Sequence, residues 1–144
     1  MTAGRYSWMK VLDVMTRDPI TVNPAETVGK ADELMYENRI RQLPVVKNGQ
    51  LVGIISDRDI RSSLSESLLA PPEVREAALN THVVELMTRN PITLSPDDEL
   101  EVAVELLVTE KFGGVPVVTE AEGLVGIVTY VDLLRCFLNG LRED

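Results

Sequence analysis

The sequence GIISDRDI at residues 53–60 returns in altered form as GIVTYVDL at residues 126–133. Each stretch is an apolar, strand-like run with a glycine and then a hydroxyl residue, followed three positions later by an aspartate. A Ser or Thr placed three residues before a carboxylate, where a strand gives way to a helix, is typical of a helix cap. The same place offers unpaired N–H groups and a partial positive charge, which also suit a bound phosphate. Both interpretations are open from these residues alone, and the chain contains the pattern twice.

The similarity between the two halves extends over most of the chain. Residues 14–24, VMTRDPITVNP, match residues 86–96, LMTRNPITLSP. The match continues, with a one-residue insertion near Ala121, through LPVV at 43–46 with VPVV at 115–118 and LVGI at 51–54 with LVGI at 124–127. Self-similarity of this length indicates two copies of one supersecondary unit. Because neither copy would bury much core alone, we expect the two to pack face to face as one pseudo-symmetric domain.

Each copy has the sequence pattern β-α-β-β-α. Residues 19–22 (PITV) predict a short first strand. Residues 23–26 (NPAE) combine an N-cap residue, a proline at the first helical position and a glutamate three after the cap, so a helix is expected from Pro24. Residues 95–98 (SPDD) repeat this signal in the second copy.

The rest of each copy predicts an amphipathic helix, a hairpin and a second helix. Apolar residues at helical spacing predict one core-facing stripe per first helix: Val28, Ala31 and Met35 in one copy, and Leu100, Ala103, Val104 and Leu107 in the other. Asn48-Gly49 between two β-branched runs predicts a two-residue hairpin turn, and residues 119–123 form a looser loop in the second copy. The apolar residues expected on the second helix are Ile60 and Leu64 in the first copy. In the second copy they are Leu133, Leu134, Phe137, Leu138 and Leu141.

Composition restricts the classes of function. The chain has 144 residues, is 44% hydrophobic and carries a formal net charge of −9, which disfavours nucleic acid and anionic membranes as partners. With one cysteine (Cys136) and one histidine (His82), neither a Cys/His zinc cluster nor a Ser/His/Asp triad has its parts. We find no nucleophile–base pair and no glycine-rich phosphate loop, so we do not expect an enzyme. No long apolar run suggests a signal peptide or a membrane span, and a cytoplasmic location is expected.

The order DVMTRDPITV, RQLPVV and GQLVGIISDRDI, repeated with small changes, resembles a tandem pair of cystathionine β-synthase (CBS) domains over residues 11–64 and 83–138. The resemblance implies an α+β fold of two β-α-β-β-α repeats, packed sheet to sheet with pseudo-twofold symmetry. The expected division is repeat 1 with its lead-in at 1–64, a connector at 65–81 and repeat 2 at 82–144. Nothing else is attached in this sequence, so a stand-alone CBS pair is expected.

The resemblance also implies a function. CBS pairs are regulatory modules that bind adenine nucleotides or related adenosyl ligands in clefts between the repeats and transmit their state to a partner. The candidates are AMP, ADP, ATP, S-adenosylmethionine and NAD(H), none of them an obligatory cofactor. A homodimer and an effector protein of unknown identity are the expected macromolecular partners. The alternative is a structural or dimerisation module without a physiological ligand.

By the same resemblance, each ligand site combines strand residues of one repeat with the hydroxyl–carboxylate pair of the other. The first expected site consists of Ile20, Thr21, Arg41, Gln42 and Leu43 with Thr129 and Asp132. The second consists of Ile92, Thr93, Gly113, Gly114 and Val115 with Ser56, Arg58 and Asp59. The Asp would accept hydrogen bonds from the ribose hydroxyls, the Ser or Thr would donate to phosphate, and Ile, Leu and Val would cover the base. Because the two sets of residues differ, we expect two sites of different affinity.

Three further features have simpler interpretations. His82 is expected at the surface or at a helix start, and Cys136 as a small core or interface residue. The apolar stripe from Leu133 to Leu141 is large for a short terminal helix, and part of it is expected to form a dimer face.

Overall fold

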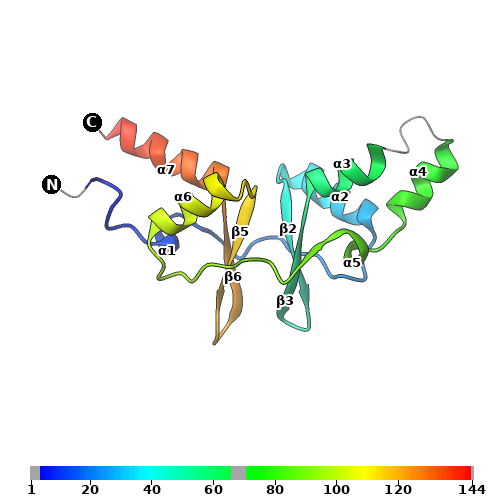
Figure 1. Ribbon diagram of the computed structural model, residues 1–144, viewed down its shortest axis with the longest axis horizontal. Helices are drawn as coiled ribbons and strands as arrows, with labels where there is room; N and C mark the ends of the chain where they lie inside the picture. Colours follow the sequence, from blue (N-terminus) through cyan, green and yellow to red (C-terminus); the bar gives the residue numbers. More distant parts are fainter. Residues whose placement is uncertain (1–3, 66–70, 144) are drawn as a thin grey trace. The chain divides into compact units, whose positions relative to one another are not determined.

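The computed structural model describes residues 4–65 and 71–143 (Figure 1). The chain divides into two compact units. The central unit comprises Ile20–Pro91, and the terminal unit joins Met1–Pro19 to Ile92–Asp144. Part of the expected connector, residues 66–70, lies outside the described residues, and its remainder contains a helix, α4 (Pro72–Leu79).

The central unit contains a three-stranded antiparallel sheet of order β2-β3-β4. Its strands are β2 (Gln42–Lys47), β3 (Gln50–Ser56) and the short β4 (Thr88–Arg89). The helices beside α4 are α2 (Val28–Asn38), α3 (Asp57–Ser65) and the short α5 (Val83–Leu86). In Figure 1 the β2–β3 turn points away from α2 and α3.

The terminal unit repeats this arrangement with a sheet of order β1-β6-β5. Its strands are β1 (Thr16–Arg17), β5 (Gly114–Thr119) and β6 (Gly123–Thr129). Its helices are α1 (Val11–Val14), α6 (Leu100–Thr109) and α7 (Tyr130–Arg142). The mixed helix and strand content and the two three-stranded sheets agree with the predicted α+β class.

The compact units and the sequence repeats are not the same segments. Strand β1 belongs to the first repeat but pairs with β6 of the second, with Thr16 opposite Ile127. Strand β4 belongs to the second repeat but pairs with β3 of the first, with Thr88 opposite Ile54. The first strand of each repeat therefore completes the sheet of the other repeat.

The glycine of the repeated GII/GIV motif permits this pairing. A Cβ added at Gly53 would lie 2.6 Å from Met87 Sδ and 2.8 Å from the Thr88 carbonyl oxygen. A Cβ at Gly126 would lie 2.7 Å from Met15 Sδ and 2.8 Å from the carbonyl oxygen of the residue that follows Met15. Only a residue without a side chain lets the short strand approach β3 or β6 this closely.

Each unit has a core of its own, built from matching positions of the two repeats. The helix stripes are confirmed, since Val28, Ala31 and Met35 are buried in the central unit and Leu100, Ala103 and Leu107 in the terminal unit. Val104 is an exception, because its side chain is 38% exposed. The inward orientation predicted for Val104 is wrong.

The first strands lie earlier than predicted. Residues 19–22 form no strand, and only Val22 makes a parallel bridge, to Val45. The paired residues are 16–17, because Asp18 takes a left-handed conformation (φ 47°) and Pro19 has no N–H to donate. Asn90 (φ 48°) ends β4 in the same way.

The first helices begin later than predicted. Asn23 Oδ1 accepts from Ala25 N–H at 2.8 Å and closes a turn, and helix α2 begins only at Val28. Thr27 is its N-cap and accepts from Lys30 N–H at 3.1 Å. The NPAE and SPDD motifs are therefore turns that precede the helices, because Asn and Ser side chains bond their own backbone two residues on.

The hairpin prediction is confirmed. Asn48 and Gly49 both have positive φ, 51° and 79°, as a type I′ turn requires. Residues 47 and 50 pair directly across this turn, and residues 119 and 123 pair across the longer loop of the second copy.

Candidate functional site

The first hydroxyl–carboxylate pair stands where β3 passes into α3. Asp59 Oδ2 accepts from Ser56 N–H at 2.8 Å, and Ser56 Oγ accepts from Asp59 N–H at 3.1 Å. Both side chains are half-buried. The reciprocal bonds satisfy two N–H groups that a helix start leaves without partners.

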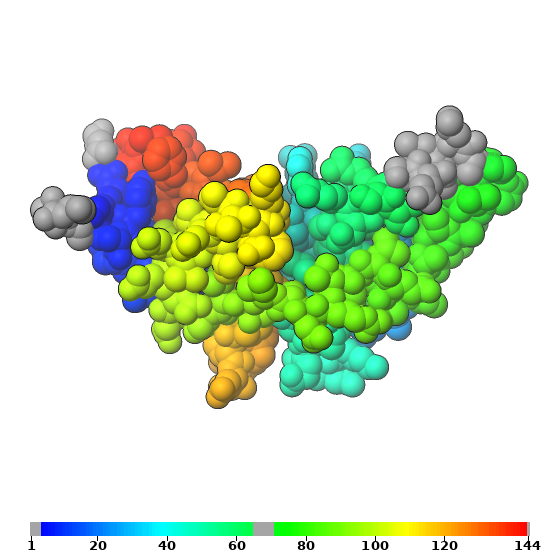
Figure 2. All heavy atoms as spheres, viewed as in Figure 1, coloured from blue at the N-terminus to red at the C-terminus, as the bar shows by residue number. Residues whose placement is uncertain are grey.

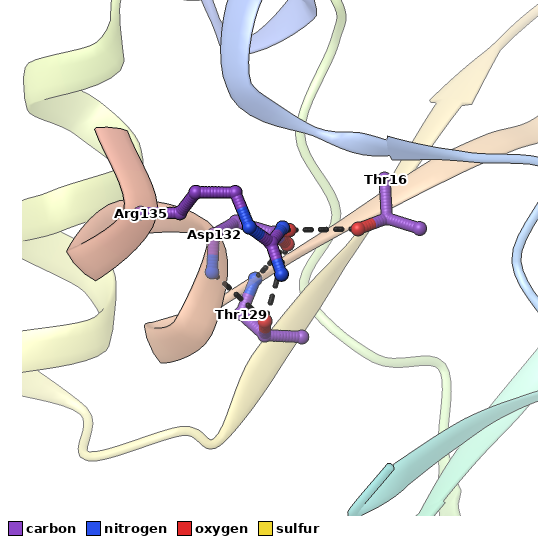
Figure 3. Close-up of polar contacts among 4 residues, drawn as sticks. All are labelled: Thr16, Thr129, Asp132 and Arg135. Atoms are coloured by element: carbon purple, nitrogen blue, oxygen red, sulfur yellow. Dashed lines mark hydrogen bonds and ion pairs between the residues drawn. The ribbon is translucent and has the colours of Figure 1, made fainter. Parts of the chain in front are cut away.

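The second pair stands where β6 passes into α7 and has the same geometry (Figure 3). Asp132 Oδ2 accepts from Thr129 N–H at 2.8 Å, and Thr129 Oγ1 accepts from Asp132 N–H at 3.4 Å. The capping interpretation is confirmed for both motifs. It does not conflict with a ligand role, since each carboxylate has more acceptor positions than a cap uses.

Among the described residues, the Asp132 carboxylate has partners that Asp59 lacks. Thr16 Oγ1 of β1 donates to Asp132 Oδ1 at 2.7 Å, and the Arg135 guanidinium lies 3.5 Å from the same oxygen. Thr129 Oγ1 lies 3.1 Å from Oδ2. Asp132 is accordingly buried, with 4% of its surface exposed. Thr16 was not identified from the sequence, because its role depends on the crossing of β1 into the other repeat's sheet. Arg135 was also missed, although its position three residues after Asp132 on α7 is a local signal.

Strand starts lie directly beside these helix starts within each unit. Gln42 is opposite Ser56 in the β2–β3 ladder, and the Arg41 carbonyl accepts from Asp57 N–H at 2.8 Å. Gly114 is opposite Thr129 in the β5–β6 ladder. The structure thus brings together, inside one unit, strand residues and a carboxylate that the resemblance assigned to different sites.

The remaining candidates fall into exposed and buried groups. Ile20 and Thr21, and Ile92 and Thr93, are exposed and precede the parallel bridges at Val22 and Leu94. Leu43 and Val115 are fully buried in the two cores, so their part in binding would fall to backbone groups. Gly113 is half-buried.

The side chains around the two helix starts differ between the copies. Arg41 and Arg58 are exposed, and neither forms an ion pair with another residue in the described part of the chain. The Asp57 carboxylate pairs with Arg61 at 2.9 Å rather than with Arg58. In the other copy the Tyr130 hydroxyl donates to the Leu107 carbonyl at 2.7 Å. The central unit therefore presents cationic side chains at its helix start, where the terminal unit has a tyrosine held by α6.

His82 and Cys136 have structural roles. The His82 N–H donates to Glu85 Oε2 at 2.9 Å at the start of α5, which confirms the helix-start interpretation. Cys136 is half-buried on α7, and its Sγ lies 3.9 Å from Met9 Sδ. Burial raises the pKa of the Cys136 thiol, and the nearby Asp13 and Glu143 carboxylates raise this pKa further.

Helix α7 presents an apolar face at the surface. Leu134, Phe137, Leu138 and Leu141 are between 43% and 65% exposed. The N-terminal segment covers part of the helix, with the Tyr6 and Phe137 rings 6.5 Å apart, and Figure 2 shows this segment (blue) beside α7 (red). Between Tyr6, α6 and α7 lies a mainly apolar groove of about 440 Å³. No helix within residues 4–65 and 71–143 is long and apolar enough to cross a membrane.

Two copies of one small α+β unit, each with a hydroxyl–carboxylate pair at a helix start, define a tandem-repeat protein. The model of the CBS domain family matches residues 11–66 and 83–139. The chain therefore belongs to the CBS domain family, as a tandem pair, and the predicted α+β CBS-repeat fold is confirmed.

Solved structures of CBS pairs are similar over nearly their whole length. The structure of CBSX2 from Arabidopsis thaliana in complex with AMP has a TM-score of 0.76 and 32% identity, covering 90% of this chain and 96% of that one. The CBS domain pair of protein MJ0100, in complex with 5′-methylthioadenosine and S-adenosyl-L-methionine, has a TM-score of 0.77 and 30% identity, covering 92% and 98%.

Some curated relatives are longer proteins. The uncharacterized protein MJ1225 of Methanocaldococcus jannaschii is 36% identical over 133 residues, which cover 87% of this chain and 48% of that protein. The chain thus spans about half the length of this relative.

Proposed function

We propose that the chain is a regulatory module that binds an adenosyl ligand, with AMP, ADP, ATP, S-adenosylmethionine and NAD(H) as candidates, and transmits its bound state to a partner protein. Membership of the CBS family supports this function, as do the complexes of CBSX2 with AMP and of MJ0100 with 5′-methylthioadenosine and S-adenosyl-L-methionine. The proposal includes no catalytic step.

The observation that carries the proposal is the start of α3. There the Asp59 carboxylate, the Ser56 hydroxyl and the exposed Arg58 lie within one helical turn, beside the first residues of β2. A carboxylate can accept both hydroxyls of a ribose, while a hydroxyl, a cationic side chain and the helix dipole favour phosphate. The proposed ligand residues remain those given by the resemblance, and their grouping across the two repeats stays a prediction.

A thermal-shift experiment tests the proposal. A ligand present at a hundred times its Kd stabilises the native state by about 2.7 kcal/mol, which corresponds to a rise in melting temperature of roughly 5–10 °C for a chain of this size. We expect this rise with at least one of AMP, ATP, S-adenosylmethionine and NADH at millimolar concentration. The Asp59→Asn variant should lose most of it. The matched control is Asp57→Asn, two residues away, whose carboxylate pairs with Arg61. No stabilisation by any of these ligands contradicts the proposal.

A second candidate function is an interaction module that acts through its apolar surface. The exposed face of α7 and the adjoining groove favour this function. Burying such a face against a second copy of the chain would remove its apolar area from water. Retention of a specific dimer together with a lack of ligand binding would favour this alternative.

A further inference from the structure

We infer, on the basis of the proposed function, that the two carboxylates have different roles. Asp59 accepts the ribose hydroxyls of the ligand, whereas Asp132 is a structural latch that joins strand β1 to helix α7. The chain therefore has one high-affinity site for an adenosyl ligand rather than two.

The acceptor positions of Asp132 are fully used. An ionised carboxylate has about four lone-pair positions. Oδ2 has the Thr129 N–H and the Thr129 hydroxyl as partners, at 2.8 and 3.1 Å. Oδ1 has the Thr16 hydroxyl at 2.7 Å and the Arg135 guanidinium at 3.5 Å. The dashed lines of Figure 3 converge on this one side chain.

The acceptor positions of Asp59 are largely unused. Its Oδ2 accepts the Ser56 N–H at 2.8 Å, and no other hydrogen bond or ion pair to its carboxylate occurs within the described residues. No residue in the described part of the chain occupies the lone pairs of Oδ1. Two adjacent ribose hydroxyls need this number of acceptor positions.

The difference follows from the sequence of the two repeats. Arg135 aligns with Ser62, so the first repeat has no cation at that position. Thr16 aligns with Thr88, and both threonines lie opposite an isoleucine of the adjoining strand. Among the described residues, however, Thr88 donates no hydrogen bond to Asp59.

A ribose at Asp132 would have to displace the Thr16 hydroxyl. Arg135 contributes less to the latch because its side chain is 64% exposed. Asp132 is buried, although Thr16 itself is exposed. A hydrogen bond to a charged group is worth roughly ten- to hundredfold in an equilibrium constant. The latch therefore lowers the affinity of the Asp132 position by about this factor relative to the Asp59 position. The hydrogen bond from Thr16 to Asp132 also joins β1 to the start of α7.

Isothermal titration of the full chain with AMP tests which carboxylate binds. We expect one equivalent of AMP per chain, binding at least tenfold more weakly in Asp59→Asn. In the double variant T16V/R135S, which releases Asp132, a second equivalent should bind. Two equivalents of AMP bound with similar affinity by the unchanged chain would overturn the inference. So would a loss of AMP binding in Asp132→Asn that is not seen in Asp59→Asn. If the double variant still binds only one equivalent of AMP, the bonds from Thr16 and Arg135 are not what prevents AMP from binding at Asp132.

Thermal unfolding without ligand tests the latch by itself. We expect Thr16→Val and Asp132→Asn each to lower the melting temperature by about 3–6 °C, and the two together by no more than the larger single effect. The matched pair Thr88→Val and Asp59→Asn should be additive. Additive effects of Thr16→Val and Asp132→Asn would overturn the latch. A latch that is confirmed in a chain that binds no adenosyl compound would instead mean that the proposed function has failed.

Discussion

Met15 lies directly against Gly126, so that a Cβ at this glycine would be 2.7 Å from the methionine sulfur and 2.8 Å from the carbonyl oxygen of the next residue. The sulfur is the mobile end of a side chain and can move aside. The carbonyl oxygen belongs to strand β1, which is hydrogen-bonded to β6, and cannot move without breaking the ladder. This contact explains why GII and GIV each contain a glycine in the middle of a strand.

A methyl group at this position should therefore be destabilising. We expect Gly126→Ala to lower the free energy of unfolding by about 1–3 kcal/mol, as overpacking in a well-packed core does. Urea denaturation followed by circular dichroism measures the change. Gly4→Ala is the control, because a Cβ there meets nothing within 4 Å. Equal stability of Gly126→Ala and the unchanged chain would mean that β1 does not pair with β6 in solution.

The two hydroxyl caps should contribute similarly to stability. We expect Ser56→Ala and Thr129→Ala each to cost about 1 kcal/mol, because each leaves a helix N–H group without its partner. Chemical denaturation provides the measurement. Ser63→Ala, at an exposed position of α3, the helix that Ser56 caps, should change stability by less than about 0.5 kcal/mol. If Ser56→Ala and Thr129→Ala lose no more stability than Ser63→Ala does, the capping geometry is contradicted.

The Cys136 thiol should be slow to react at neutral pH. Burial holds the pKa of this thiol above its ordinary value of 9.0, so little thiolate is present. We expect a thiol reagent at pH 8 to label native protein more slowly than unfolded protein, with the native rate rising at higher pH. Faster labelling of the native protein than of the unfolded protein at pH 8 would indicate that the pKa is lowered instead.

The same shift has a consequence for stability. Below pH 9 the thiol is protonated in both states, and its contribution to stability is fully present. As the pH rises through 9, the unfolded thiol loses its proton first, which favours the unfolded state. The free energy of unfolding of the unchanged chain should therefore fall between pH 8 and pH 10 relative to that of Cys136→Ala. A rise in the free energy of unfolding relative to that of Cys136→Ala would mean that folding lowers the pKa of this thiol instead.

The apolar face of α7 should mediate self-association. Leu134 is 65% exposed, and we expect Leu134→Glu to shift the chain toward the monomer in light scattering coupled to size exclusion. Val74→Glu, on α4, replaces another half-exposed apolar residue and should leave the mass unchanged. The same mass for Leu134→Glu and the unchanged chain would remove α7 from the interface.

The features that depend on local interactions could be predicted from the sequence. The helix stripes and the Asn48-Gly49 turn could be predicted because each depends on residues close together in the chain. The internal repeat could be found by comparing the sequence with itself. The capping bonds of Ser56 and Thr129 belong to the same group. The resemblance supplied the family and the ligand class.

The predictions that failed are of two kinds: contacts between distant segments, and local signals that fit more than one structure. Thr16 and Asp132 are 116 residues apart, and no local pattern indicates that β1 completes the sheet of the other repeat. The starts of the first helices were predicted too early because Asn23 and Ser95 are good cap residues whose side chains close turns instead. Val104 matches a helical apolar spacing but lies at the edge of the stripe, beside the α7 groove.

The most direct test of the central claim is a crystal structure of the chain grown with AMP. We predict that the ribose hydroxyls lie within about 3.2 Å of the Asp59 carboxylate, with the phosphate near the start of α3, and that Thr16 still donates to Asp132. A nucleotide bound elsewhere, with Asp59 facing away from it, would contradict the account.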